Sequence, residues 1–124
     1  MIPKGFVAHL YDTSVTRGIS TFIDNVNLEK GERGRMFVPI ISEGYADSEW
    51  CLGEITKMVK CRRAEPWRLI ILPVFFGVEP SDFGNQKGPF LPAFERHENN
   101  EKLKEEVSDW KNALREVRTI LGST

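Results

Sequence analysis

The chain has few of the residues from which metal sites and disulfides are built. Among its 124 residues there are two cysteines and two histidines. On one helix Cys51 and Cys61 would lie about 15 Å apart, which is too far for a disulfide. Two thiols that do not pair in a disulfide are typical of a protein in a reducing compartment. Because no cysteine pair has metal-binding spacing and His9 and His97 are the only imidazoles, we predict no metal site.

An excess of charge of one sign and long apolar runs are also missing. The 17 basic and 18 acidic residues nearly cancel, whereas nucleic-acid binding normally requires a basic face, so we expect no nucleic-acid partner. The start of the chain, Met-Ile-Pro-Lys, does not resemble a secretory signal, and no run approaches membrane-spanning length. We therefore expect a soluble protein of the cytoplasm, or of cytoplasm and nucleus, that does not bind membranes.

Glycine-rich phosphate-binding loops of the Walker or dinucleotide type are absent, which argues against kinases and dehydrogenases. The apolar fraction is 40%, and no tract is of low complexity. A chain of this length and composition is predicted to fold as a single domain over residues 1–124.

Apolar spacing predicts alternating helices and strands. Gly5 to Arg17 has the periodicity of a half-buried helix, and Ile19 to Ile23 is a short strand rich in β-branched residues. Met36 to Ser42 and Leu69 to Phe76 are nearly continuous apolar runs, which is typical of parallel strands buried on both faces. Each run contains a proline that cannot donate to a ladder, so each proline is expected where that donor is not needed. The two residues are Pro39 and Pro73.

The segment from Asp24 to Arg35 is too poor in apolar residues for a crossover helix. A parallel connection needs a helix whose apolar face packs on the sheet, but these twelve residues include only two apolar ones. Gly31 and Gly34 each disfavour a helix by roughly 1 kcal/mol relative to alanine. We therefore predict that no helix covers the sheet here.

The segment from Glu101 to Leu121 is predicted to form a long helix with an apolar seam. The seam would suit a coiled coil, but about two to three heptads rarely suffice, so a helix docked on its own sheet is favoured. The apolar residues recur at spacings of four and three: Leu103, Val107, Trp110, Leu114, Val117 and Leu121.

The most informative stretch is the strand-to-helix corner from Asp47 to Glu54, because open α/β sheets bind ligands at the carboxyl ends of their strands. It supplies a hydroxyl at Ser48, an aromatic ring at Trp50 and a carboxylate at Glu54. The ring and the carboxylate are four residues apart and share one helix face. A flat aromatic ring beside a negatively charged group is suited to binding a ligand that contains a base and a sugar.

This corner resembles a known family signature. Ser-Glu-Trp-Cys-Leu-Gly-Glu-Ile at 48–55 looks like the Ser-x-Trp-Cys-Leu-x-Glu-Leu motif of the plant-type Toll/interleukin-1 receptor (TIR) domains of disease-resistance proteins. Three further segments are similar to the second strand, the fourth strand with its following loop, and the Trp-Arg-x-Ala-Leu helix of that family. In order, they are Arg17 to Asp24, Ile71 to Asp82 and Trp110 to Leu114. The resemblance covers nearly the whole chain.

The resemblance implies an α/β fold of the flavodoxin-like TIR type, a parallel sheet flanked by helices, in truncated form. The first strand of the family, which ends in Phe-Arg-Gly-x-Asp-Thr-Arg, is missing, and so is the helix between strands two and three. The domain is therefore expected to be incomplete at the N-terminus and between residues 24 and 35. Because the missing strand is the central one in this fold, Ile19 to Ile23 and Met36 to Ser42 would pair directly or with a borrowed strand.

The resemblance also implies a function in plant innate immune signalling, through NAD+ hydrolysis to nicotinamide and ADP-ribose products upon self-association. NAD+ would be the substrate, no cofactor would be bound, and other TIR domains would be the partners. Glu54 matches the catalytic glutamate of the family, and its carboxylate would stabilise the charge formed as the glycosidic bond breaks. By residue type alone, Glu54 would be a carboxylate that interacts with the helix macrodipole. The alternative function is a non-enzymatic TIR adaptor or decoy acting through TIR–TIR interaction.

The other candidate site residues also have ordinary structural explanations. Trp50 matches a position at the nucleotide site of the family, although tryptophan is commonly a core anchor. Ser48 would bind the ligand or cap the helix, and these roles are compatible. Lys30 resembles the basic residue of a loop that can approach the nucleotide, although a solvated lysine is the default. His9 occupies the second place of a Ser-His pair used at helix interfaces in many members, but Ala8 replaces the serine.

Cys51 and His97 are one further pair that would suggest a nucleophile and a base. Nothing in the sequence brings them together, and such a cysteine is commonly a small buried hydrophobe. We expect His97 to lie on the surface.

Overall fold

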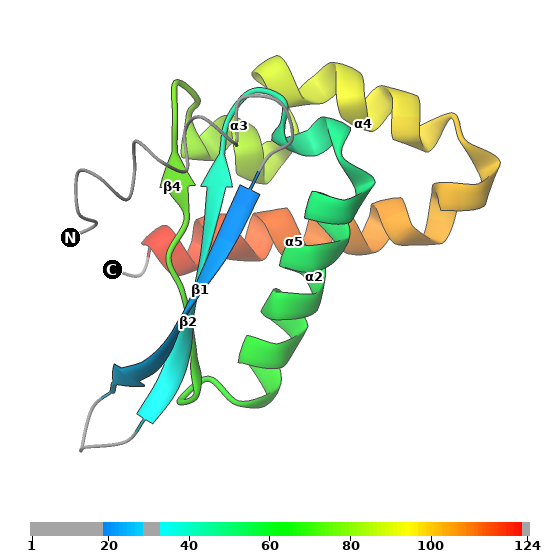
Figure 1. Cartoon of the computed structure of the whole chain (residues 1–124). Coiled ribbons are helices and arrows are strands. Elements are labelled where there is room, and N and C mark those ends of the chain that lie inside the picture. Colours follow the sequence, from blue (N-terminus) through cyan, green and yellow to red (C-terminus); the bar gives the residue numbers. More distant parts are fainter. Residues whose placement is uncertain (1–18, 29–32, 123–124) are drawn as a thin grey trace.

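The described residues form a four-stranded mixed sheet with helices packed against it (Figure 1). The computed structural model describes residues 19–28 and 33–122, so the predicted helix from Gly5 to Arg17 lies outside the described residues. The elements are β1 (Ile19–Asn27), β2 (Arg33–Ile41), η2 (Tyr45–Asp47), α2 (Glu49–Ala64), β3 (Leu69–Ile71), β4 (Val74–Phe75), α3 (Pro80–Asn85), η3 (Gly88–Phe90), α4 (Leu91–Glu98), η4 (Glu101–Leu103) and α5 (Lys104–Gly122).

β1 and β2 form an antiparallel pair, which corrects the prediction of a parallel sheet. Ile19 lies opposite Ile40 at one end of the ladder, and Asn27 lies opposite Arg33 at the other. The connection between the strands is too short for a parallel crossover, so reversal of the chain is the remaining way for them to pair. The expectation that these strands pair directly is confirmed. The described residues from Asp24 to Arg35 form no helix, because Asp24 to Asn27 belong to β1 and Arg33 to Arg35 belong to β2.

β2 is the central strand, because β3 and β4 pair with its other side in the parallel direction. The run predicted as one strand, Leu69 to Phe76, is divided at Pro73 into two short strands. Phe37 pairs with Ile71 and Ile40 pairs with Val74, so Pro39 is level with this interruption. The missing N–H groups of both prolines therefore fall where the parallel ladder is already broken.

The main core lies between the sheet and the helices. Phe37 and Ile41 of β2 join buried residues of β3, α2, α3, α4 and α5 in one cluster. α5 packs against α2 and α3 and buries most of the predicted seam, so the docked-helix prediction is confirmed. Val38 and Ile40 alternate with these residues and form a second, smaller cluster with Met36, Val74 and Phe76. The apolar run of β2 is thus buried on both faces, as its composition predicted.

Candidate functional site

The candidate site is built by the chain that leaves the carboxyl end of β2. One turn of 3-10 helix, η2, precedes α2, and Ser48 at the junction has extended backbone angles. The Ser48 hydroxyl accepts a hydrogen bond from the backbone N–H of Cys51 at 3.1 Å, so Ser48 is the N-cap of α2. The capping role considered for Ser48 is confirmed, and its role in ligand binding stays a prediction.

Trp50 and Glu54 lie on the first two turns of α2 and differ in exposure. Trp50 is 78% exposed, so the explanation of this ring as a core anchor is wrong. Glu54 is half-buried. A large ring that the fold leaves in water is available for contact with a ligand or a partner.

Ser20 contributes to the site, and no sequence pattern identified it. Its Oγ donates a hydrogen bond to Glu54 Oε1 across the gap between β1 and α2. Ser20 is opposite Pro39 because β1 runs antiparallel to β2, so the beginning of β1 lies beside the end of β2. Finding this contact would have required knowing the direction of β1, which the sequence did not reveal.

Two further ionisable groups are buried next to this carboxylate. Burial raises the pKa of Tyr45 well above its usual value of 10.0, and the nearby Cys51 and Glu54 raise it further. Burial also raises the pKa of the Cys51 thiol above its usual 9.0, with a smaller increase from Glu54 and an opposing hydrogen bond with Ser48. Cys51 is therefore a protonated thiol at neutral pH and a poor nucleophile.

These raised pKa values predict a loss of stability at alkaline pH. The folded state keeps the protons of Tyr45 and Cys51 more tightly than the unfolded state, so the free energy of unfolding should fall as the pH rises above about 9. Each group contributes a slope of at most about 1.4 kcal/mol per pH unit. Urea unfolding between neutral pH and pH 10 measures this dependence. Cys51→Ala should have a shallower slope, and an unchanged slope would contradict the assignment to Cys51.

His97 is buried, and the prediction that it lies on the surface is wrong. It is 4% exposed, and its Nε2 donates a 2.8 Å hydrogen bond to the carbonyl oxygen of Ala46 in η2. Its ring packs edge-on against Trp110 of α5 with centroids 5.3 Å apart. On the same helix, Arg96 forms an exposed ion pair with Asp47 at 2.9 Å. α4 therefore holds the turn that leads into α2.

The pairing of Cys51 with His97 as nucleophile and base has no support in the structure. The Nε2 of His97 is engaged with Ala46, and its ring lies between Phe94 and Trp110. A spacing signal for its burial was present, because Phe90, Phe94 and His97 recur at helical intervals on one face of the segment.

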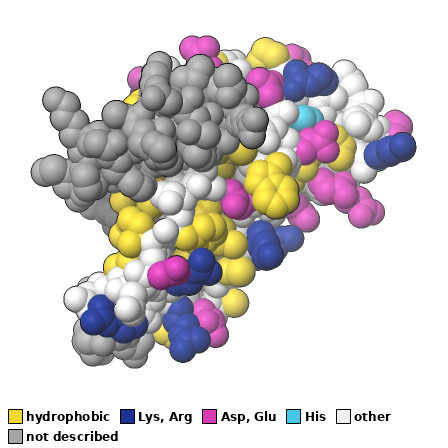
Figure 2. Space-filling view, in the orientation of Figure 1, with side chains coloured by type: hydrophobic (Ala, Val, Ile, Leu, Met, Phe, Trp, Pro, Cys, Tyr) yellow, Lys and Arg dark blue, Asp and Glu magenta, His cyan; other side chains and the backbone are white. Residues whose placement is uncertain are grey.

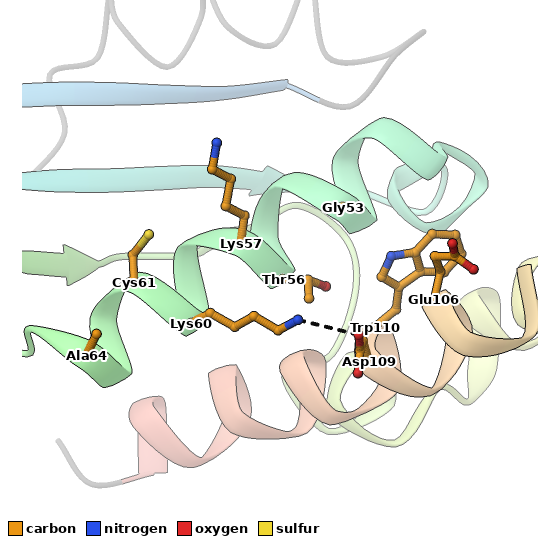
Figure 3. Close-up of a pocket in the computed structure, with 9 residues that line it drawn as sticks. All are labelled: Gly53, Thr56, Lys57, Lys60, Cys61, Ala64, Glu106, Asp109 and Trp110. Atoms are coloured by element: carbon orange, nitrogen blue, oxygen red, sulfur yellow. Dashed lines mark hydrogen bonds and ion pairs between the residues drawn. The ribbon is translucent and has the colours of Figure 1, made fainter.

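A groove of about 510 Å³ lies between α2 and α5, and Glu54 does not line it (Figure 3). Figure 3 shows Lys60 reaching from α2 to Asp109 of α5, a pair separated by 3.4 Å, while Lys57 points away from α5. Thr56 and Trp110 line the groove from the two helices. This groove is part of the contact between two helices and is separate from the candidate site.

Some of the predicted features involve residues that the structure does not describe. Others concern a metal site or a membrane-spanning helix that the sequence was expected to lack. Lys30, Ala8 and His9 are not among the described residues. Within 19–28 and 33–122, no group of three or more metal-ligating side chains converges. Over the same ranges, no helix combines the length and apolar character of a membrane span.

Comparison with known proteins gives a consistent family assignment. The TIR domain family model matches residues 3–124. TMV resistance protein N of Nicotiana glutinosa is 36% identical over 134 aligned residues, which cover 97% of this chain and 11% of that protein. Probable disease resistance protein RPP1 of Arabidopsis thaliana is 33% identical over 132 residues, which cover 98% of this chain and 11% of that protein. The chain therefore spans about a tenth of the length of these curated relatives.

The fold is also similar to that of a solved assembly. The TIR domains in the activated Roq1 resistosome, which directly recognises the pathogen effector XopQ, align with a TM-score of 0.65 and 30% identity. The alignment covers 94% of this chain and 76% of that chain. The two sequence alignments above are longer than this chain, so the relatives carry residues at positions where it has none.

Proposed function

Because this chain belongs to the TIR domain family, we propose that it cleaves NAD+ between nicotinamide and ribose, with Glu54 as the catalytic carboxylate. The observation that carries the proposal is the half-buried Glu54, which accepts a hydrogen bond from Ser20 one helical turn from the exposed Trp50. The group lies beyond the carboxyl end of β2, where ligands of α/β sheets bind.

The proposed chemistry needs a negative charge close to the ribose. As the bond from C1′ of the ribose to the nicotinamide nitrogen breaks, the electron pair stays with the nitrogen and nicotinamide leaves as a neutral molecule. The ribose ring then carries an oxocarbenium-like positive charge, which the Glu54 carboxylate stabilises. Water adds to C1′ and loses a proton, and the products are nicotinamide and ADP-ribose.

The neighbouring residues have supporting roles in this proposal. The hydrogen bond from Ser20 holds one oxygen of the Glu54 carboxylate in a fixed direction. The exposed indole of Trp50 stacks on a flat part of the substrate, and Ser48 and Lys30 add polar contacts. NAD+ is then a substrate, and no cofactor is needed.

We further propose that the chain acts in plant immune signalling by associating with other TIR domains in the cytoplasm. The likeness to disease-resistance proteins and to TIR domains within a resistosome supports this role. Association would bring more than one copy to the site, and NAD+ cleavage would depend on protein concentration.

Nicotinamide release from NAD+ by purified, folded protein at high concentration tests the enzymatic proposal. Glu54→Ala should reduce the rate by at least about a hundredfold, because the charge opposite the developing cation is lost. Glu49→Ala is the matched control, since Glu49 is an exposed carboxylate on the first turn of the same helix. Equal rates for the wild type and Glu54→Ala would contradict the role of Glu54.

A non-enzymatic adaptor or decoy is the second candidate function. The antiparallel direction of β1 favours this second function. A catalytic site that is built on an all-parallel sheet would be changed at the place where β1 contacts Glu54. In this case, folded protein would release no nicotinamide, and a cell-death assay in leaves would give the same signal with the wild type and Glu54→Ala. Glu54-dependent release would overturn the adaptor proposal.

A further inference from the structure

A second hollow lies at the end of the sheet remote from Glu54. Its volume is about 350 Å³, within the usual range of small-molecule sites. Figure 2 shows Lys and Arg side chains, with Asp and Glu side chains beside them, around exposed apolar surface at the end of the molecule where β1, β2 and the end of α2 lie. The lining residues used below are Arg33, Arg35, Arg68, Glu65, Met58 and Leu69.

The backbone brings the three arginines together. Arg33 and Arg35 are two residues apart on β2 and project from the same face of the strand. The backbone N–H of Arg35 donates to the carbonyl oxygen of Arg68 at 2.9 Å, which fixes the loop before β3 beside β2. A Cβ on Gly34 would lie 2.6 Å from that oxygen, so this close approach requires glycine. The three guanidinium groups thus come from two segments that are held in register.

Two of these guanidinium groups are already oriented. The Nε of Arg35 donates to Asp24 at 2.7 Å, and its guanidinium carbon lies 4.6 Å from the centre of the Phe22 ring. The Nη1 of Arg33 donates to the carbonyl oxygen of Asn25 at 3.1 Å. A guanidinium group has five N–H donors, so most donors of each arginine remain available for a ligand.

Charge and apolar surface are combined in this hollow. Its charged lining consists of three arginines and Glu65, and Glu65 lies 3.7 Å from Arg68. Asp24 pairs with Arg35 at 2.7 Å, so Arg33 is the arginine of the hollow whose charge no described carboxylate pairs. Met58 and Leu69 add apolar surface between the charges. The ordinary explanation is that the arginine stems cover the end of the core while their charges remain in water. That explanation accounts for the presence of long side chains at this place. It does not account for the grouping of three arginines around one hollow.

We propose that this hollow binds a small ligand that carries a phosphomonoester on a flat apolar body, with a nucleoside monophosphate as the simplest representative. The arginines bind the phosphate oxygens, because guanidinium groups match the geometry of phosphate and form charge-assisted hydrogen bonds. Met58 and Leu69 contact the body of the ligand. The site is independent of NAD+ cleavage and lies at the opposite end of α2 from Glu54.

Titration calorimetry of the folded chain with AMP at low ionic strength tests the proposal. We expect saturable binding of AMP, and weaker binding of adenosine and of inorganic phosphate, which each lack one half of the ligand. The double variant Arg35→Gln, Arg68→Gln should weaken AMP binding by at least about tenfold, since charge-assisted hydrogen bonds are lost. Arg115→Gln is the matched control, because this exposed arginine bonds Asn112 on α5.

Arg33→Gln supplies a second variant in case the double variant does not fold, since Arg33 forms no ion pair with a described residue. It should also weaken AMP binding, by about tenfold. The proposal is overturned if AMP does not bind, if folded arginine variants bind AMP like the wild type, or if adenosine binds as tightly as AMP. Inorganic phosphate that binds as tightly as AMP would overturn the role of the apolar lining.

Discussion

Truncating Phe83 to alanine is expected to lower the free energy of unfolding by about 3 to 5 kcal/mol. Phe83 is 0% exposed and packs edge-on against Tyr45, Phe75 and Phe90, with ring centroids 5.9, 5.6 and 5.3 Å away. The variant loses these aromatic contacts as well as the transfer energy of the ring. Single domains are typically stable by only about 5 to 15 kcal/mol, so much of the protein would be unfolded at moderate denaturant concentration.

The three rings around Phe83 come from β4, η2 and η3, so its loss disconnects segments that are distant in sequence. Urea unfolding followed by circular dichroism measures the effect. Leu91→Ala, which truncates a 45% exposed apolar side chain near Phe90, should change the free energy of unfolding by no more than about 0.5 kcal/mol. Similar losses for Phe83→Ala and Leu91→Ala would contradict the role of Phe83 as the centre of the aromatic cluster.

Replacing His97 with leucine is expected to destabilise the fold by about 2 to 4 kcal/mol, although the side chain keeps a similar size. The carbonyl oxygen of Ala46 would lose its 2.8 Å hydrogen bond while Ala46 stays buried, and an unsatisfied buried acceptor is costly. The contact between His97 and Trp110 would be lost as well. Thermal or urea unfolding would show the loss.

Arg96→Ala is the comparison for the His97 variant, because both residues connect α4 to the same turn. The Arg96–Asp47 pair is exposed, so its removal should cost at most about 1 kcal/mol. Hydrogen exchange supplies a local readout, since the amides of Asp47 and Ser48 bond to carbonyl groups within this turn. Faster exchange there in His97→Leu than in Arg96→Ala is expected, and equal exchange would show that the buried bond does not hold the turn.

The sequence predicted those features that depend on short-range pattern. The periodicity from Glu101 to Leu121 predicted both α5 and the face it buries. The corner at Ser48 predicted the start of α2, because a serine before an amphipathic run is a standard helix cap. The composition of Asp24 to Arg35 argued against a crossover helix, and the described part of this segment contains none. Each of these inferences needed only neighbours within a few turns.

Features that depend on the direction and stacking of distant segments were not predicted. The side-chain alternation of a strand is the same in either direction, so Ile19 to Ile23 gave no sign that β1 would reverse. The contact of Ser20 with Glu54 follows from that reversal. His97 was misassigned although Phe90, Phe94 and His97 recur at a helical spacing that places the histidine on the buried face.

The antiparallel pairing of β1 and β2 also affects how the chain folds. In a parallel arrangement the first strand pair forms only after a long crossover has closed, and such long-range contacts slow folding. Here Asn27 lies opposite Arg33 at the near end of the ladder, and the pairing continues, with an irregularity in register between Ile23 and Val26, to Ile19 opposite Ile40. A hairpin of this kind forms within microseconds, about 1 to 10 μs in peptides. We therefore expect the first strand pairing to be a fast local event and the docking of α2 and β3 on β2 to be the slower step.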